Sequence, residues 1–222
     1  MAWRLLAGTG AGALVGLVIG GIGGRLVMLL LRLASDDSVL GLESDDGFEI
    51  GRISTETGFL LMVGAGLGGA TGVAYVVLRS AFPTRARAAV WGVVAALLTG
   101  SDIVNTDGVD FALLDPKPFA IASFVLLPGL AAFTIAVVVE RLLAVEPWSK
   151  RWLTVVLALG ALFMNVVLVA VAAVAGAAVV LRRVPAIARA VLVIGRVAVP
   201  VAFVVLAVRS GVYLWRDATE IL

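Results

Sequence analysis

Cysteine and histidine are both absent from this chain of 222 residues. Without cysteine there can be no disulfide, no thiolate metal site and no cysteine nucleophile. Without histidine the chain lacks the commonest transition-metal ligand and the commonest general base. Lysine occurs only at Lys117 and Lys150, both in expected loops, which disfavours a Schiff base inside a helix bundle. We therefore expect a protein that is not an enzyme and that needs no cofactor.

Charge is also scarce. Only 14% of the residues are charged, whereas a soluble domain carries about a quarter, and 62% are hydrophobic, with a mean hydropathy of +1.13. The apolar residues form long blocks, and runs of 18 or more apolar residues are typical of transmembrane helices. The composition predicts an all-α integral membrane protein, a single transmembrane domain over residues 1–222. Its expected surroundings are the lipid bilayer, without a nucleic-acid partner.

Six apolar blocks are long enough to cross a hydrocarbon core of about 30 Å, which takes about 20 helical residues. They cover residues 5–31, 58–79, 88–105, 119–140, 152–181 and 191–213. The first block continues well beyond the 7–15 residues of a signal-peptide core, so we interpret it as a retained helix. The blocks predict a six-helix transmembrane bundle.

The segments between these blocks differ in charge on the two sides of the membrane. The side with both termini and the turns at 79–87 and 140–151 has nine basic and four acidic residues, a balance of +5. The other side, with segments 32–57, 102–118 and 182–189, has six basic and eleven acidic residues, a balance of −5. Because basic residues stay in the cytoplasm, we expect both termini inside and an acidic outer cap.

The segment 182–189 is an exception, since it is basic but falls on the outer side. Arg182, Arg189 and Arg196 are spaced by seven residues and share one helical face. An interfacial helix over 182–196 would explain this pattern, with arginines toward headgroups and apolar residues toward lipid. The alternative is a short late turn that escapes the charge rule.

The two outer segments resemble each other. Residues 46–50 and 107–111 both follow the order Asp, Gly, apolar, acidic, apolar, and each lies between an outward and an inward helix. Helices 1–2 and 3–4 could then be tandem hairpins related by an axis along the membrane normal, or the match could be coincidence. Alternating apolar residues at 48–53 and 109–113 also predict short β segments in the cap.

The loop over residues 45–52, the glycine-rich first helix and residues 107–111 resemble a group of uncharacterised multi-pass membrane proteins of actinobacteria. The resemblance covers about the first 140 residues. It implies a bacterial cell membrane and no particular activity.

Glycine recurs every fourth residue in the first two blocks. The positions are Gly8, Gly12, Gly16, Gly20 and Gly24 in the first, and Gly64, Gly68 and Gly72 in the second. Small residues let helices approach closely in a bilayer, where lipid tails are as apolar as leucine. The spacing predicts close helix packing, with either the second helix or another copy of the first as the partner.

Few other residues suggest a site. Asp45, Asp46 and Glu49 could supply oxygen ligands to a cation, although the loop fails the EF-hand spacing and a solvated acidic loop is the simpler interpretation. Arg25, Asp102 and Arg196 are charges within or near the apolar blocks, which are functional candidates by default. We expect Arg25 to face the bundle and to contact an outer acidic side chain as a structural clamp between the two hairpins, with Asp102 as the first choice and Asp46 or Glu49 as substitutes.

These observations favour a non-enzymatic scaffold or accessory subunit with an acidic extracytoplasmic cap, working as a homo-oligomer or with a membrane-protein partner. The alternative is a small channel or transporter for an ion or small solute, with glycine-lined helices beside its path.

Overall fold

The computed structural model describes residues 2–36, 55–104, 115–144 and 185–222. The first helix consists of three consecutive parts, α1 (Ala2–Val15), the π-helical η1 (Gly16–Gly23) and α2 (Gly24–Ala34). Four further α-helices follow: α3 (Thr55–Leu78), α4 (Arg87–Ile103), α6 (Lys117–Leu143) and α9 (Pro185–Ile221). A short 3-10 turn, η3 (Arg79–Ala81), extends α3. The described residues contain no strand.

Helix ends follow from local chemistry. Phe82 is extended and precedes Pro83, which is the conformation that a following proline imposes, so the chain turns between η3 and α4. Pro116 precedes the first residue of α6, and Pro118 occupies its first turn, where a missing amide proton costs no helical hydrogen bond. At the end of α2, the Ser35 amide and hydroxyl both donate to the Leu31 carbonyl oxygen.

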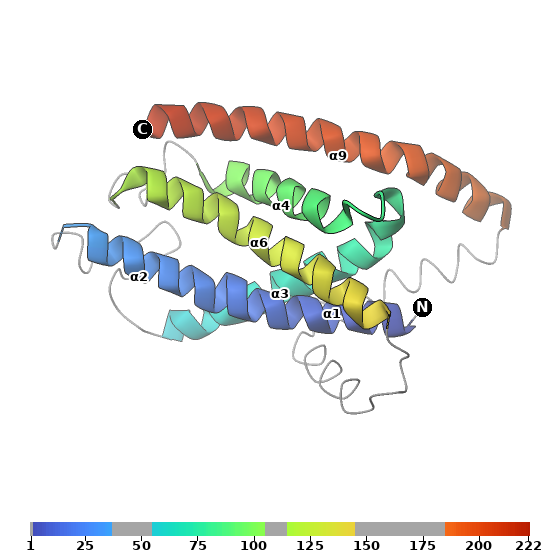
Figure 1. The fold of residues 1–222 in the computed structure, drawn as a ribbon, viewed down its shortest axis with the longest axis horizontal. Helices are drawn as coiled ribbons and strands as arrows, with labels where there is room; N and C mark the ends of the chain where they lie inside the picture. Colours follow the sequence, from blue (N-terminus) through green and yellow to red (C-terminus); the bar gives the residue numbers. More distant parts are fainter. Residues whose placement is uncertain (1, 37–54, 105–114, 145–184) are drawn as a thin grey trace.

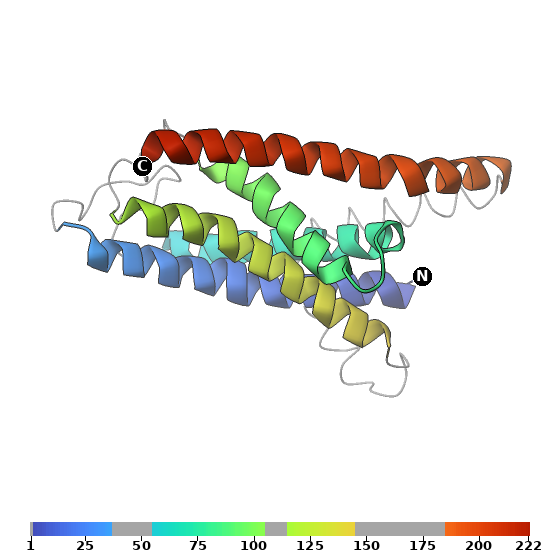
Figure 2. The same cartoon turned by 45° about the horizontal axis from the view of Figure 1, so that its top comes forward.

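The helices run along the bundle in alternating directions (Figure 1, Figure 2). The first helix and α3 form one antiparallel pair, and α4 and α6 form a second pair packed against it. α9 lies along α4 on the outside of the bundle, and it starts at the end where α6 finishes.

Four helical stretches are long and apolar enough to cross a membrane: Trp3–Ala34, Thr57–Ala81, Lys117–Leu143 and Ala198–Ile221. α4 has 17 residues, about 26 Å, and is the shortest of the five helices. The apolar blocks therefore located these helices within a few residues, except that the last helix is much longer than 191–213. The predicted fifth helix at 152–181 and both predicted β segments lie outside the described residues.

The prediction for 182–196 was wrong in both of its forms. From Pro185 onward the chain is part of α9, a continuous helix of 37 residues, about 56 Å, which also contains Arg189 and Arg196. Neither a separate interfacial helix nor a turn over 185–189 is present. The sequence offered no clear boundary, because Ala, Val, Ile and Arg all favour helix and Pro185 is tolerated at a helix start.

The prediction that both termini lie on one side also differs from the structure. Residues near the C-terminus lie where α4 ends and α6 begins: Leu214 approaches Gly100, and Lys117 Nζ donates to the Ile221 carbonyl oxygen at 3.5 Å. Figure 1 shows the two termini at opposite ends of the bundle. We call the end with the N-terminus and η3 the basic end, and the end with Leu31 and Lys117 the acidic end.

Each end has its own core. At the basic end, Tyr75, Phe82, Trp91 and Val139 are among the buried residues. At the acidic end a smaller cluster contains Leu31, Val104 and Ala120, with Leu214 and Ile221 of α9 packed on it. The Ser35 hydroxyl connects the end of α2 to the residue Asp115 before α6: it accepts from the Asp115 amide at 2.9 Å, and its single proton is shared between the Leu31 and Asp115 carbonyl oxygens, at 2.9 and 3.1 Å.

Candidate functional site

The basic end contains a cluster of polar side chains centred on Glu140, near the end of α6. The Glu140 carboxylate forms a two-point contact with the Arg79 guanidinium, in which Nε donates to Oε1 at 2.9 Å and Nη2 contacts Oε2. The Tyr75 hydroxyl donates to Oε1 at 2.7 Å, and Arg87 Nη1 lies 3.4 Å from the same oxygen. We call Tyr75, Arg79, Arg87 and Glu140 the ionic cluster.

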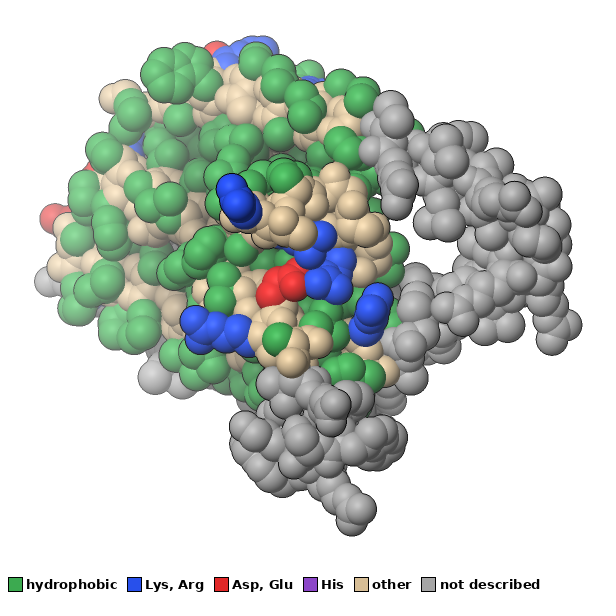
Figure 3. All heavy atoms as spheres, turned by 45° about the vertical axis from the view of Figure 1, so that its right-hand side comes forward, with side chains coloured by type: hydrophobic (Ala, Val, Ile, Leu, Met, Phe, Trp, Pro, Cys, Tyr) green, Lys and Arg blue, Asp and Glu red, His purple; other side chains and the backbone are tan. Residues whose placement is uncertain are grey.

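The local sequence explains how these groups converge. Tyr75 and Arg79 are one helical turn apart, so both face α6. The tight turn after η3 brings Arg87 back to the same level, and its Nε donates to the Phe82 carbonyl oxygen at 3.2 Å. The cluster thus joins α3, α4 and α6. Figure 3 brings this end forward and shows Lys and Arg side chains gathered around an acidic group, surrounded by hydrophobic side chains.

Aromatic rings lie beside the ionic cluster. Trp91 meets the Tyr75 ring edge-on at 5.7 Å and the Phe82 ring at 6.1 Å. Phe203 from α9 completes the group, with its ring centre 5.2 Å from that of Phe82 and 5.7 Å from that of Trp91. Tyr75 is fully buried and the Trp91 side chain nearly so. The rings limit water access from one side and strengthen the electrostatic contacts of the cluster.

The chemistry available to Glu140 is structural. Its two oxygens accept from a guanidinium, a phenol and a second guanidinium, so the charge is neutralised and the carboxylate is held in place. A two-point arginine contact is among the stronger charged interactions in proteins. The cluster therefore acts as a clamp between three helices.

A charged clamp was predicted between Arg25 and Asp102, with Asp46 or Glu49 as substitutes that lie outside the described residues. Asp102 is exposed, and within the described residues it forms no ion pair with Arg25. The reason is helical geometry: Gly100 and Val104 are buried, and Asp102 lies about 200° around α4 from each of them. Arg25 is half-buried, with Nε and Nη2 shielded from solvent.

A signal for the observed clamp was present in the sequence. Arg79, Arg87 and Glu140 each lie at the boundary of a predicted helix, and the charge count placed all three on one side of the membrane. Helix ends at the same depth in neighbouring spans can meet. The pairing was not inferred because these residues were counted as loop charges.

Among the predicted glycines, three on the first helix lie directly against three on α3. The pairs are Gly8–Gly72, Gly12–Gly68 and Gly16–Gly64. A methyl group added to Gly12 would overlap the Gly68 carbonyl oxygen, and a methyl group on Gly68 would overlap the Gly12 carbonyl oxygen. The two backbones are therefore in direct contact. We call this row of contacts the glycine seam.

The seam departs from the predicted four-residue stripe within η1. A Cβ on Gly20 would lie 3.7 Å from Gly64 Cα, and one on Gly24 would have only a Leu127 methyl group within 4 Å, at 3.8 Å. Gly21 takes the contact instead: it is buried, and its amide nitrogen lies 2.8 Å from where a Cβ on Gly64 would be. A π-helix forms i→i+5 hydrogen bonds, so its turn is wider than that of an α-helix. The step from Gly16 to the next contact is therefore five residues.

A second glycine contact, which was not predicted, joins α4 and α6. A Cβ on Gly92 would lie 3.0 Å from the Gly129 carbonyl oxygen, and one on Gly129 would lie 3.1 Å from that of Gly92. In each antiparallel pair, glycine residues thus allow the two helix backbones to approach closely.

The remaining predicted residues are placed as follows. Arg196 lies within α9, one turn before Pro200, and the helix continues through that proline. The cation candidates Asp45, Asp46 and Glu49 lie outside the described residues.

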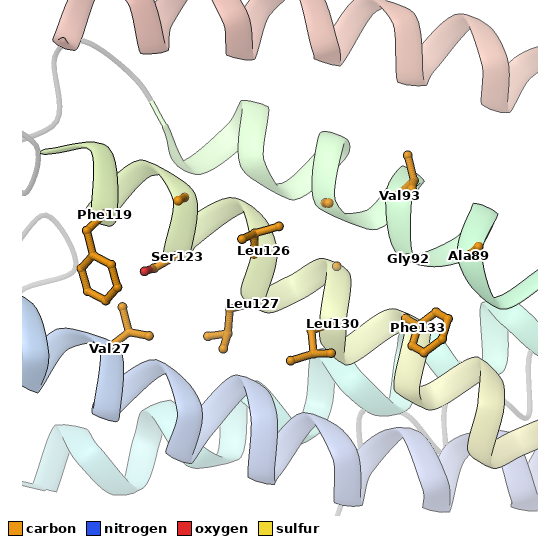
Figure 4. A pocket seen from close by; sticks show the side chains of 13 residues that line it. Val27, Ala89, Gly92, Val93, Phe119, Ser123, Leu126, Leu127, Leu130 and Phe133 are labelled. Atoms are coloured by element: carbon orange, nitrogen blue, oxygen red, sulfur yellow. The ribbon is translucent and has the colours of Figure 1, made fainter.

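An apolar groove of about 810 Å³ runs along one side of α6, between α4 and α2. Figure 4 shows Phe119, Leu127, Leu130 and Phe133 of α6 along it, with Val27 of α2 on one side and Val93 of α4 on the other. Ser123 contributes the only hydroxyl group of the lining. The groove offers contacts to an apolar chain and almost none to an ion or a polar solute.

Comparison of the chain with protein-family models, with curated proteins and with solved structures found no match.

Proposed function

We propose that this chain is a multi-pass protein of a bacterial cell membrane that works as a non-enzymatic scaffold or accessory subunit. The observation that carries this proposal is that the ionic cluster and the glycine seam are both used in contacts between helices. Glu140 is saturated by its partners, the first helix and α3 touch through backbone atoms, and the groove is apolar. A conduction path would instead need polar or charged lining.

The outer surface supports a membrane setting. Within the apolar stretch of Lys117–Leu143 only 22% of residues are buried inside the bundle, and within that of Ala198–Ile221 only 6%. Large apolar side chains such as Leu126, Val204 and Val212 are more than 60% exposed. Surfaces of this extent are rare on soluble monomers and are ordinary where lipid or a partner helix covers them.

The charge distribution supports an orientation with the N-terminus inside and the C-terminus outside. In the described residues the basic end has one acid, Glu140, against Arg4, Arg79, Arg85, Arg87, Arg141 and Arg189. The acidic end has three bases, Arg32, Lys117 and Arg216, against six acids, Asp36, Glu56, Asp102, Asp115, Asp217 and Glu220. Basic residues mark the cytoplasmic side.

Purified protein in liposomes separates this proposal from the channel alternative. We expect ion and small-solute flux equal to that of protein-free liposomes, and native mass spectrometry of the same preparation to show a defined oligomer or a retained partner. Flux that rises with protein content and is lost when the groove or the glycine seam is altered would refute the scaffold proposal.

A further inference from the structure

We infer that the apolar groove holds one acyl chain of an anionic phospholipid whose phosphate is bound by Arg85 and Arg141. The lining of the groove runs along α6 from Phe119 to Phe133, a distance of about 21 Å. Phe133 lies eight residues, about 12 Å, from Arg141 along α6, and one leaflet of the hydrocarbon core is about 15 Å deep, so an acyl chain anchored at Arg141 enters the groove at its basic end.

The shape of the groove favours a flexible chain over a helix. Leu126 and Leu130 project from α6 with 65% and 55% of their surface exposed. Helices in a bilayer pack closely where small residues form the contact, and projecting leucines keep a second helix at a distance. An acyl chain can bend between these side chains and cover them.

Two arginines lie beyond the basic end of the groove. Arg85 is in the turn that leads into α4, four residues before Ala89, which lines the groove. Arg141 is eleven residues after Leu130 on α6, so it lies on nearly the same helical face, within about 20°. Both arginines flank the contact between Arg87 and Glu140, which places them where α4 meets α6.

These two arginines are available for a headgroup. Both side chains are exposed, and neither forms an ion pair with another described residue, whereas Arg79 and Arg87 are occupied by Glu140. Arg79, Arg87 and Glu140 together have a net charge of +1, so the ionic cluster adds to the positive potential at this end. Guanidinium groups bind phosphate oxygens in a two-point geometry, and basic pockets between transmembrane helices on the cytoplasmic side bind anionic headgroups.

The test uses the full chain in micelles that contain equal amounts of phosphatidylglycerol and phosphatidylcholine with identical acyl chains. Native mass spectrometry measures the ratio of the two lipids retained on the protein. We expect the wild type to prefer phosphatidylglycerol, and Arg85→Gln and Arg141→Gln each to lower that preference about fivefold. This factor corresponds to about 1 kcal/mol per basic residue near an anionic surface. Arg4→Gln is the matched control, because Arg4 is exposed at the same end on a helix part that does not line the groove.

The acyl chain is tested separately with Ala89→Trp, which fills the basic end of the groove, against Leu67→Trp on the exposed face of α3. We expect only the first to abolish lipid retention while both variants keep the wild-type elution volume and helicity. Three results would overturn the inference: equal retention of both lipids by the wild type, an Arg4→Gln effect as large as those at Arg85 and Arg141, or unchanged retention in Ala89→Trp.

Discussion

At the scale of single residues, burial decides which charges hold the structure together. Glu140 keeps about a third of its side chain exposed and still has three partners, which lie on two other helices. The pair of Arg216 and Glu220 is of the same chemical type, yet both side chains are more than half exposed and lie on one helix. Exposed pairs contribute little because solvent screens them and the side chains lose entropy on pairing.

Glu140→Gln should lower the free energy of unfolding by about 1–3 kcal/mol, the range for a lost hydrogen bond to a charged group. The neutral amide would leave Arg79 and Arg87 facing each other without a counter-ion. The measurement is reversible denaturation in detergent, followed by circular dichroism. Glu220→Gln is the control and should change stability by less than about 0.5 kcal/mol. Equal effects of the two substitutions would show that the ionic cluster is not a clamp.

At the scale of helices, the glycine seam explains how the first helix and α3 pack. Four-residue spacing in an α-helix drifts by about 40° per step, so a straight stripe leaves its partner after a few contacts. The π-helical turn of η1 changes the step to five residues and keeps glycine at the contact through Gly21. The π-helical turn thereby adds one contact, that of Gly21, to the glycine seam.

Gly12→Ala should be strongly destabilising, by about 2 kcal/mol or more, because the added methyl group overlaps backbone atoms of α3 and forces the helices apart. Gly20→Ala should be neutral or stabilising by up to about 1 kcal/mol, since alanine has the higher helix propensity and the site has room. Thermal unfolding of both variants checks this. The reverse order of stabilities would mean that the predicted four-residue stripe, and not the observed seam, makes the contact.

The sequence was sufficient to predict where the helices lie, because the length of an apolar block and the polar ends around it are local properties. The sequence was also sufficient to predict that Gly8, Gly12 and Gly16 pack closely, since their four-residue spacing is typical of close helix packing. It could not predict the shift to Gly21, because a π-helical turn depends on the partner surface. The sequence could not exclude Asp102 as a partner of Arg25, because the burial of Gly100 and Val104, which face the opposite way, is known only from the structure.

At the scale of the whole molecule, the number of crossings decides where the chain ends. The sequence predicted six crossings and therefore both termini on one side of the membrane. The described helices instead put α9 in the direction opposite to α6, with the C-terminus at the acidic end. The charge count alone could not predict on which side the C-terminus lies, since basic and acidic residues are nearly equal in number near it.

The central claim, a membrane-spanning bundle with its termini on opposite sides, is tested by single cysteines in a chain that has none of its own. Thr84 is exposed at the basic end and Leu222 at the acidic end, so each is replaced by cysteine in a separate variant. In intact cells, a membrane-impermeant maleimide should label Leu222→Cys at once and should label Thr84→Cys only after the membrane is permeabilised. Labelling of both positions from the same side would contradict the account.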